Sequence, residues 1–367
     1  MNKQTKADFD AAMMRRCLEL AQRAAGKTSP NPLVGSVVVK NGKVIGEGFH
    51  PGVGQPHAEV FALRDAGEEA HGATVYVNLE PCNHYGRTPP CSEALIEARV
   101  AKVVTGMVDP DPRVAGGGID KLRKAGIEVV VGVEEQACRQ LNEAFIHRTT
   151  KKQPFGILKY AMTLDGKIAA TGGHSAWVTG KSSRQLVHQL RSTCDAVIIG
   201  GNTVRKDNPN LTTHGVTQHN PLRVVMSRSL DLPSECNLWH TDVAPTIVFT
   251  ENNGNTPLKQ KLLSKKVEVI TVAALTPKVV MEHLYQKELS KILWECGGTL
   301  AAKAIADGTI QKVMAFIAPK IIGGTSAPTP IGELGLSQMT DALQLKKVTV
   351  KAIASDILIE GYLSTED

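Results

Sequence analysis

Short apolar runs alternate with amphipathic helical patterns along almost the whole chain, and this alternation restricts the fold more than any other feature. Residues 73–80, "ATVYVNLE", form such a run, and helical patterns of about ten residues separate it from similar runs further on. A strand that is followed by a crossover helix pairs in parallel with a later strand. The sequence therefore predicts an α/β fold whose sheets are mostly parallel, with helices on their faces.

One polar segment interrupts the alternation. Residues 147–154, "HRTTKKQP", have no apolar periodicity, and a strand pattern restarts at 155–163, "FGILKYAMT". A chain of 367 residues is long enough for two domains of ordinary size. We therefore predict two α/β domains, which comprise residues 1–147 and 148–367.

Composition and charge exclude several classes of protein. The net charge of +6 is modest, and no run of Lys and Arg is interleaved with aromatic residues. This favours an anionic small molecule as the partner over a nucleic acid. No apolar stretch reaches about 18 residues, so no membrane span is expected. Homo-oligomer formation stays open.

Cysteine usage and the N-terminus indicate the compartment. The seven cysteines are odd in number and scattered, which argues against a secreted disulfide scaffold. The N-terminal residues lack an apolar signal core. We expect a reducing, cytoplasmic location. The alternative is the plastid stroma, if a transit peptide has been removed.

Two of these cysteines, Cys82 and Cys91, lie close together in the segment "EPCNHYGRTPPC" at 80–91. The segment contains too much Pro and Gly to be a helix or a central strand. Three interpretations are possible, namely a disulfide, a pair of buried small hydrophobic residues, or a metal site. The scattered cysteine pattern weakens the first interpretation.

A histidine upstream favours the metal site. His57 precedes Cys82 by 25 residues, at the predicted start of a helix, and Glu59 follows it by two. One imidazole and two thiolates give zinc three ligands and leave a fourth position for water, whose pKa falls to about 7. Glu59 is placed to shuttle protons without binding the metal. An H-x-E…P-C-x-x-C pattern is typical of zinc deaminases, although the gap between the cysteines is longer here.

At this point the first half resembles a known family, the bifunctional riboflavin-biosynthesis proteins that fuse a pyrimidine deaminase to a pyrimidine reductase. The resemblance rests on "TSPNPLVGSVVVKNGKVIGEGFHPGVGQPHAE" and "LEPCNHYGRTPPC". It implies a cytidine-deaminase-like α/β/α sandwich. It also implies that the substrate contacts Asn31, His50, His84 and Arg87. The Arg87 cation would suit a ribose phosphate.

The second half has no G-x-G-x-x-G dinucleotide motif, but glycines follow two predicted strands. These junctions, with "LKYAMTLDGKIA" and "GGHSAWVTG", resemble the reductase half of the same family, which is dihydrofolate-reductase-like and uses NADPH. The resemblance implies NADPH contacts at Ala161, Trp177, Thr203, Asp207, Gly297, Gly298, Thr299, Leu300, Ala301, Ala302 and Lys303. It implies substrate contacts at Ser175, Arg191, Leu211, His214 and Glu295.

Two residues depart from the family pattern. His214 stands where an arginine is common, and Ser227 stands where an aspartate is expected. Neutral histidine holds a phosphate less well than arginine does. These departures raise the alternative of a deaminase whose reductase-like domain is inactive or impaired.

The sequence thus supports one main hypothesis about function and several rivals. The main hypothesis is a riboflavin-biosynthesis enzyme with one Zn²⁺ in the deaminase site. It deaminates 2,5-diamino-6-(5-phosphoribosylamino)pyrimidin-4-one and then uses NADPH to reduce the ribosyl side chain to ribityl. The rivals are the deaminase alone, a binding module with a structural zinc, and a nucleic-acid deaminase. A structural zinc usually has four protein ligands, and an aromatic, basic strand-binding groove is not evident.

Overall fold

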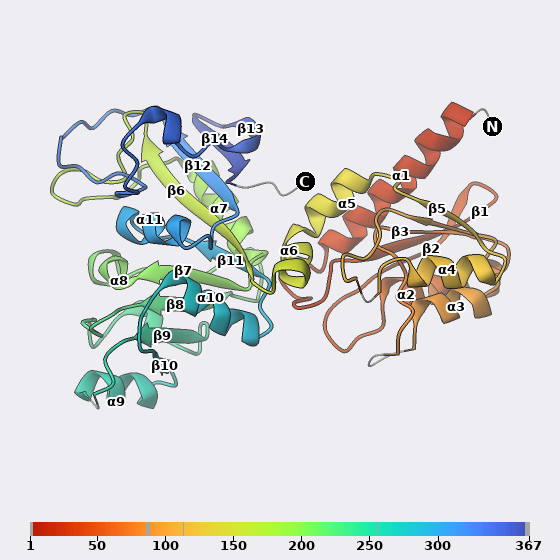
Figure 1. Ribbon diagram of the computed structural model, residues 1–367, viewed down its shortest axis with the longest axis horizontal. Helices are drawn as coiled ribbons and strands as arrows, with labels where there is room; N and C mark the ends of the chain where they lie inside the picture. The colour runs from red at the N-terminus through yellow and green to blue at the C-terminus, as the bar shows by residue number, and fades with distance from the viewer. Residues whose placement is uncertain (1–2, 86–88, 113, 255, 364–367) are drawn as a thin grey trace. The chain divides into compact units, whose positions relative to one another are not determined.

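The computed structural model describes residues 3–85, 89–112, 114–254 and 256–363, and its chain divides into two compact units, Met1–Lys152 and Gln153–Asp367 (Figure 1). The division follows residue 152 rather than residue 147. The polar segment predicted as a break is largely helical, because α6 spans Glu143–Lys151. Its polar side chains belong to an amphipathic surface helix, which has no fully buried residue.

The first unit contains a five-stranded sheet in the order β2-β1-β3-β4-β5. Its elements are α1 (Lys3–Gln22), β1 (Gly35–Lys40), β2 (Lys43–Phe49), α2 (Ala58–Ala66), β3 (Thr74–Val77), α3 (Cys91–Glu97), β4 (Lys102–Thr105), α4 (Gly117–Lys124), β5 (Glu128–Val131) and α5 (Glu135–Leu141), followed by α6. Strands β3, β4 and β5 are parallel, but β1 is antiparallel to both of its neighbours.

Two of the four strand pairs in this unit are therefore antiparallel, and the Asn-Gly turn between two apolar runs in "VGSVVVKNGKVIGEGFH" predicts the β1–β2 hairpin. The cause is the turn at Asn41–Gly42, where both residues have positive φ angles of 51° and 74°. Such a turn makes β1 and β2 an antiparallel hairpin. Helix α2 then connects β2 to β3, and these two strands run in the same direction with β1 between them.

Helices cover both faces of this sheet (Figure 1). Helices α1 and α5 pack together on one face, and α2, α3 and α4 form a row on the other. Two glycines allow the close approach of helix to strand. A Cβ on Gly35 would lie 2.1 Å from the carbonyl oxygen of Cys17 in α1, and one on Gly48 would lie 2.5 Å from that of Ala58 in α2. This α/β/α sandwich fixes the start of α2 beside the sheet.

The second unit is built on a nine-stranded sheet in the order β10-β9-β8-β7-β11-β6-β12-β14-β13. Its strands are β6 (Phe155–Thr163), β7 (Ala196–Gly200), β8 (Leu222–Met226), β9 (Thr246–Thr250), β10 (Glu268–Thr271), β11 (Lys291–Trp294), β12 (Lys312–Ala318), β13 (Lys346–Ile353) and β14 (Asp356–Tyr362). Its helices are α7 (Lys181–Ser192), α8 (Gly201–Asp207), α9 (Pro257–Ser264), α10 (Pro277–Gln286) and α11 (Gly298–Ala306). All strand pairs from β10 to β12 are parallel, and the closing hairpin is antiparallel, as the sequence predicts.

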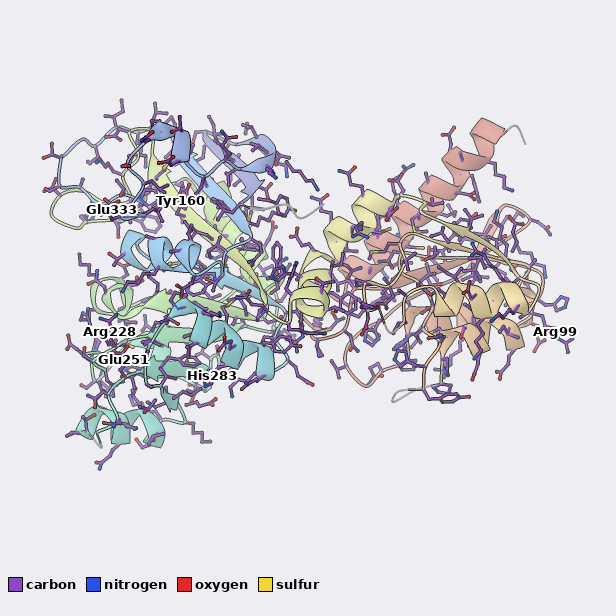
Figure 2. All side chains as sticks on the ribbon, viewed as in Figure 1. Arg99, Tyr160, Arg228, Glu251, His283 and Glu333 are labelled. Atoms are coloured by element: carbon purple, nitrogen blue, oxygen red, sulfur yellow. The ribbon has the colours of Figure 1, made fainter. Side chains whose placement is uncertain are left out.

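Helices α10 and α11 share a core with one face of this sheet. Helix α10 carries His283 (Figure 2). The ring of His283 meets that of Phe249 on β9 edge to face, with centroids 5.5 Å apart. Alternate residues on the strands, such as Ile157 and Val197, are buried on the opposite face. Among the described residues, no helix has the length and apolar character needed to cross a bilayer.

Three elements of this unit were not predicted from the sequence. Strand β9, "TIVFT", is short and follows a long irregular segment, and α8 has only seven residues. Helix α9 begins inside residues 251–260, "ENNGNTPLKQ", whose sequence shows no clear apolar periodicity. There Thr256 accepts a hydrogen bond from the Lys259 N–H, and Pro257 occupies the first turn. The capping residue Thr256 and the following Pro257 mark the start of α9, which the apolar periodicity of the sequence does not.

Candidate active sites

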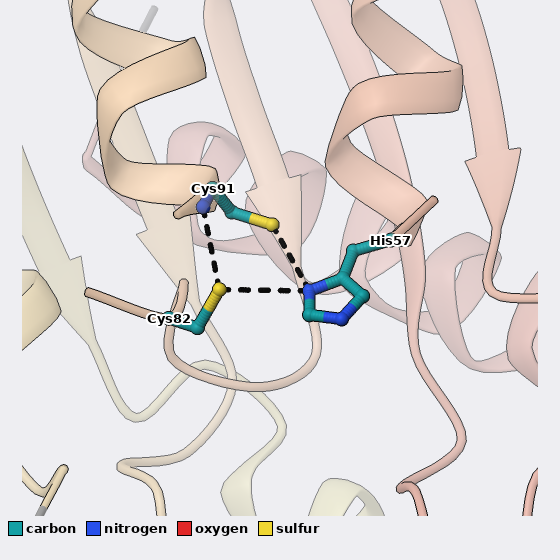
Figure 3. A group of neighbouring side chains, drawn as sticks. All are labelled: His57, Cys82 and Cys91. Atoms are coloured by element: carbon teal, nitrogen blue, oxygen red, sulfur yellow. Dashed lines mark hydrogen bonds between the residues drawn. The ribbon is translucent and has the colours of Figure 1, made fainter. Parts of the chain in front are cut away.

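The three predicted zinc ligands come together in the first unit (Figure 3). The potential ligand atoms of His57, Cys82 and Cys91 all lie within 4.8 Å of one another. His57 Nδ1 is 3.2 Å from Cys91 Sγ and 3.5 Å from Cys82 Sγ. This arrangement matches the size and the donor chemistry of a zinc site with one nitrogen and two sulfur ligands.

The helices aim these side chains at one point. His57 is the residue before α2, Cys91 is the first residue of α3, and these two helices pack side by side. Cys82 lies on the segment that leaves β3 (Figure 3). Helix N-termini carry partial positive charge and therefore favour thiolates.

The two thiols interact strongly with each other. Hydrogen bonds from the Cys91 side chain and from His57 lower the pKa of Cys82 to about 4. The Cys91 backbone N–H also donates to Cys82 Sγ at 3.3 Å. The same pairing raises the pKa of Cys91, because one proton is shared between the sulfurs. A dication placed between them replaces that proton and stabilises both thiolates.

Glu59 lies beside this cluster, on the first turn of α2. It is 3% exposed, and its Oε2 is buried with no hydrogen-bond partner among the described residues. Burial raises the pKa of Glu59 to about 7. A buried carboxyl oxygen without a partner in the described chain, beside three atoms that could hold a metal ion, fits a group that exchanges protons with a bound water.

Asn31 and His50 form a second polar pair near the cluster. Asn31 Nδ2 is 3.1 Å from His50 Nε2, and His50 Nδ1 is 3.1 Å from the carbonyl oxygen of Pro56. A carbonyl only accepts, so Nδ1 carries the proton and Nε2 accepts from the Asn31 amide. Burial lowers the pKa of His50, which agrees with a neutral ring. The rings of His50 and His57 meet edge to face at 5.4 Å.

Of the other two predicted substrate contacts in the first unit, His84 and Arg87, the structure describes only His84. His84 is exposed on the segment between the two cysteines. Arg87 lies outside the described residues. The structure therefore brings Asn31, His50 and the zinc ligands together and leaves the position of Arg87 undescribed.

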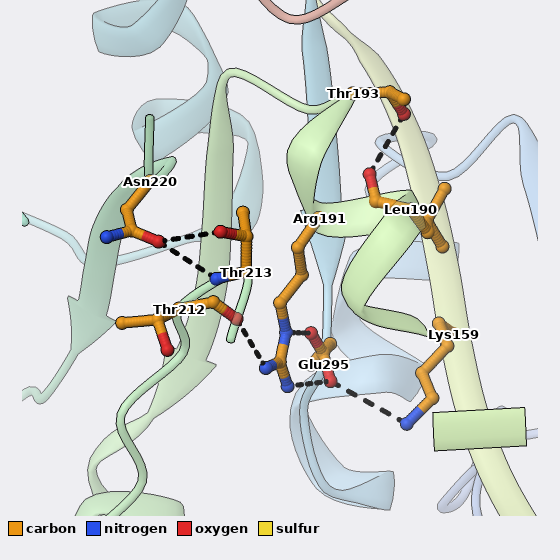
Figure 4. Close-up of polar contacts among 8 residues, drawn as sticks. All are labelled: Lys159, Leu190, Arg191, Thr193, Thr212, Thr213, Asn220 and Glu295. Atoms are coloured by element: carbon orange, nitrogen blue, oxygen red, sulfur yellow. Dashed lines mark hydrogen bonds and ion pairs between the residues drawn. The ribbon is translucent and has the colours of Figure 1, made fainter. Parts of the chain in front are cut away.

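In the second unit, Arg191 and Glu295 form a bidentate ion pair (Figure 4). Arg191 Nε and Nη2 donate to the two oxygens of Glu295 at 2.5 and 3.0 Å, and Nη1 donates to the carbonyl of Thr212 at 3.0 Å. Lys159 Nζ lies 3.6 Å from Glu295 Oε2. Burial lowers the pKa of Lys159 while Glu295 opposes that shift.

Sequence reasoning missed Lys159, although the chain carries a signal for it. A single lysine stands in the middle of the apolar strand "FGILKYAMT". Lysine is almost never buried without a partner, and here that partner is Glu295 at the end of the neighbouring strand β11.

His214 is exposed on a loop, and its ring lies against that of His188 on α7 with centroids 4.1 Å apart. The loop is anchored by Thr213, which donates from its N–H and its hydroxyl to Asn220 Oδ1 (Figure 4). Burial and the Arg191 charge lower the pKa of His214. Both effects favour the neutral form of the ring in the free protein.

Of the predicted cofactor residues, Ala161 lies within β6, and the others follow the ends of β6, β7 and β11, which are neighbours in the sheet. Leu300 lies 3.5 Å from the place where a Cβ on Gly200 would stand, so α11 begins beside the end of β7. Burial raises the pKa of Asp207 on α8, and the nearby Lys206 and Ser175 side chains oppose that shift. Helix α8 also carries Thr203. Ligands of open parallel sheets bind at this carboxyl edge.

Several of the residues predicted to contact NADPH or the substrate are buried, or have an unusual backbone conformation, in the free protein. Ala301 and Ala302 are buried in the core, and Leu211 is 4% exposed, so little of these three residues is accessible to a ligand in the free protein. Trp177 is 68% exposed, and the Arg184 guanidinium lies 4.3 Å from its ring centroid. Trp177, Leu211 and His214 all have positive φ angles, between 50° and 61°. Such strained backbone is concentrated at functional sites.

Comparison with known proteins agrees with both halves of this description. The cytidine and deoxycytidylate deaminase zinc-binding region matches residues 7–107, and the RibD C-terminal domain matches residues 154–359. The riboflavin biosynthesis protein RibD of Synechocystis is 63% identical over 98% of this chain and 97% of its own length.

The chain belongs to the RibD family.

Two solved structures of the family support the fold of the whole chain. Acinetobacter baumannii RibD is 38% identical, with a TM-score of 0.86 over 97% of this chain and 99% of that one. A diaminohydroxyphosphoribosylaminopyrimidine deaminase/5-amino-6-(5-phosphoribosylamino)uracil reductase from Thermotoga maritima is 37% identical, with a TM-score of 0.87 over the same shares. The predicted fold class, a cytidine-deaminase-like sandwich followed by a dihydrofolate-reductase-like domain, is confirmed.

The predicted enzyme class is confirmed as well. The chain is a riboflavin-biosynthesis enzyme with a zinc-dependent deaminase domain and an NADPH-dependent reductase domain. These findings support both activities and not the deaminase-only alternative.

Proposed function

We propose that the first unit hydrolyses the 2-amino group of 2,5-diamino-6-(5-phosphoribosylamino)pyrimidin-4-one, and that the second unit reduces the ribosyl group of the product to ribityl. The observation that carries the proposal is the buried Glu59 carboxyl, whose Oε2 has no partner among the described residues, beside His57, Cys82 and Cys91. The relatives named above for these two reactions supply the substrate class. Each unit has its own core, so the functional boundary is proposed to lie between residues 147 and 153.

In the deaminase site, His57, Cys82 and Cys91 would hold the zinc ion. A bound zinc ion supplies an acidified water at neutral pH. Glu59 accepts a proton from the attacking water and returns it to the departing amine. The water oxygen bonds to C2, the C2–N bond breaks, and ammonia leaves with a carbonyl at C2. The pKa of about 7 for Glu59 suits a group that both takes up and releases a proton.

Asn31 and His50 orient the pyrimidine in this proposal. His50 fixes the Asn31 amide by accepting one of its N–H bonds, so the amide oxygen and the remaining N–H face elsewhere in a defined orientation. A pyrimidine edge has complementary donors and acceptors. His84 and Arg87 are assigned to the phosphoribosyl end.

In the reductase site, NADPH, when bound, would supply a hydride to C1′ of the ribosyl group. The ring C1′–O4′ bond breaks, and O4′ takes up one proton, so the reaction also needs an acid. Lys159 is proposed as that acid, because burial makes its ammonium a better proton donor than free lysine and Glu295 holds it in place. Arg191 keeps Glu295 ionised and oriented.

The cofactor would run along the carboxyl edge of the sheet, between the start of α11 at Gly297 and Gly298 and the segment at Thr203 and Asp207. Gly297 is exposed and has open space where a Cβ would be, which leaves backbone N–H groups accessible to a phosphate. The substrate phosphate is assigned to the region of His214. It would bind weakly there because the neutral ring is a poor substitute for a guanidinium.

Separate assays of the two reactions test this proposal. The purified, zinc-loaded chain should release ammonia from the diaminopyrimidine substrate without NADPH. It should also oxidise NADPH when given the corresponding aminouracil substrate. Failure to release ammonia would overturn the deaminase assignment, and failure to oxidise NADPH would overturn the reductase assignment.

A further inference from the structure

The carboxylate of Glu80 is buried two residues before the zinc ligand Cys82. It is 3% exposed and has no cationic side chain among the hydrogen-bond donors that it contacts in the described chain. Instead it accepts four backbone N–H groups. Oε2 accepts from Asp109 at 3.1 Å and Gly116 at 3.0 Å, and Oε1 accepts from Gly118 at 2.9 Å and Ile119 at 3.3 Å.

These donors belong to a segment far from Glu80 in sequence. Asp109 follows β4, and Gly116 to Ile119 form the start of α4. A carboxylate in this position satisfies N–H groups that have no partner within the helix and also matches the positive end of α4. One side chain thus ties the segment that leaves β3 to the segment that connects β4 with α4.

The backbone next to Cys82 packs tightly against the same helix start. A Cβ on Gly118 would lie 1.9 Å from the Pro81 carbonyl oxygen, and one on Gly117 would lie 2.2 Å from Asn83 Nδ2. Both neighbours of Cys82 are therefore in contact with α4. The thiol itself points the other way, toward His57 (Figure 3).

We propose that Glu80 is a positioning residue of the zinc centre, which holds the backbone of Cys82 at the distance that His57 and Cys91 require. This inference rests on the proposed role of these three residues as ligands. It assigns Glu80 no contact with the metal or the substrate. Glu80 acts through the rigid placement of residues 81–83 between α4 and the metal.

The chemistry of the Glu80→Gln variant makes the inference testable. An amide has one oxygen and one NH₂ group, whereas the carboxylate offers an acceptor on both sides. In either orientation of the Gln side chain, two backbone N–H groups would face an NH₂ group. The 81–83 segment then loses half of its attachment to α4, while the volume of the side chain stays almost the same.

The first experiment measures zinc affinity by competition with a chelator, using the full chain and the Glu80→Gln variant. We expect zinc to bind about 10–100-fold more weakly to the variant, as is typical when support behind a metal ligand is removed. With Co²⁺ in place of zinc, the visible absorption of the cobalt–thiolate site should shift, because the Cys82 sulfur is displaced. A zinc affinity within twofold of wild type, with an unchanged cobalt spectrum, would overturn the inference.

Asp10→Ala is the matched control for a general loss of stability. Asp10 accepts a hydrogen bond from the Tyr76 hydroxyl at 2.6 Å and lies on α1, on the other face of the sheet. Its loss removes another carboxylate bond from the same unit, but zinc affinity and the cobalt spectrum should stay at the wild-type level. If Asp10→Ala weakens zinc binding as much as Glu80→Gln does, the role of Glu80 is only structural.

A second pair of variants tests the same contact without changing a charge. Gly118→Ala places a Cβ against the Pro81 carbonyl and should weaken zinc binding. Gly126→Ala, two residues beyond the end of α4, strains a backbone with φ of 84° but meets nothing within 4 Å, so it controls for a general loss of stability near α4 and should leave zinc binding unchanged. Equal affinities in this pair would contradict the inference. If the wild-type chain binds no zinc through Cys82, the proposed function itself is wrong. If the wild type binds zinc normally and the Glu80 and Gly118 variants do too, only the inference about Glu80 is wrong.

Discussion

Both carboxylate oxygens of Glu295 accept hydrogen bonds from Arg191, at 2.5 and 3.0 Å, in the interior of the second unit. Burial alone would raise the pKa of Glu295, but the charges of Arg191 and Lys159 outweigh it and lower the pKa to about 2. The carboxylate is therefore charged at neutral pH. The pair links α7 to the end of β11, at the edge where the reductase residues gather.

Glu295→Gln should destabilise the second unit. It leaves the buried guanidinium of Arg191 without a counter-charge, which typically costs about 3–5 kcal/mol. All three tryptophans, Trp177, Trp239 and Trp294, lie in the second unit, so tryptophan fluorescence in a urea titration reports on that unit alone. Glu268→Gln, which removes an exposed partner of Lys287, is the control and should cost less than about 1 kcal/mol. Equal midpoints for the two variants would contradict the account.

The stability of the second unit should fall between pH 6.5 and 4. Burial, and then the neighbouring charges of His214 and Arg191, lower the pKa of His188 from 6.5 to about 4, with Lys159 acting in the same direction and Glu295 against it. The unfolded chain therefore takes up a proton at His188 before the folded chain does, so the contribution is complete above pH 6.5 and is lost as pH falls to 4. His188→Gln should flatten this part of the fluorescence-monitored stability curve. An unchanged slope would show that another group is responsible.

Glu59→Gln should separate metal binding from catalysis. The variant keeps His57, Cys82 and Cys91, so it should bind zinc as the wild type does, but ammonia release should fall by about 10²–10⁴-fold because the proton shuttle is lost. Cys82→Ser and Cys91→Ser should lose both zinc and activity. Zinc content by atomic absorption and ammonia release give the two readouts. Near-normal deamination by Glu59→Gln would show that another group moves the proton.

Asn31→Ala should weaken binding of the diaminopyrimidine substrate. Asn31 is held by His50 at 3.1 Å, so its removal deletes an oriented hydrogen-bonding group. Loss of one such bond typically costs about 1–1.5 kcal/mol, or about tenfold in KM for deamination. The NADPH-dependent reaction of the aminouracil substrate provides an internal control and should not change. A reduced kcat with an unchanged KM would show that Asn31 acts in the chemical step and not in substrate binding.

The zinc cluster could be predicted from the sequence because each ligand stands at a recognisable boundary. His57 precedes a helical pattern, Cys82 follows a strand pattern, and Cys91 opens a second helix. Boundaries of this kind are positions where side chains from separate segments converge at a sheet edge. The unpartnered Oε2 of Glu59 could not be predicted, since it depends on how α2 packs.

The second site could be predicted less completely. Arg191 and Glu295 were expected as separate substrate contacts, whereas the structure pairs them and adds Lys159. The sequence alone does not show that Arg191 on α7 and Lys159 on β6 meet Glu295, which is more than 100 residues away from each of them. Likewise, the close contact of His214 with His188 depends on a loop conformation with positive φ, which no residue pattern in that loop specifies.

The central claim is that one chain carries out deamination at the zinc cluster and reduction in the second unit. The most direct measurement follows ammonia release and NADPH oxidation together after the zinc-loaded chain receives the diaminopyrimidine substrate. NADPH oxidation should begin only after ammonia appears, and the amount of NADPH oxidised should equal the molar amount of ammonia released. We also predict that Glu59→Gln abolishes both signals with this substrate but still oxidises NADPH with the aminouracil substrate. Ammonia release without NADPH oxidation, under conditions in which the aminouracil substrate is also not reduced, would contradict the claim.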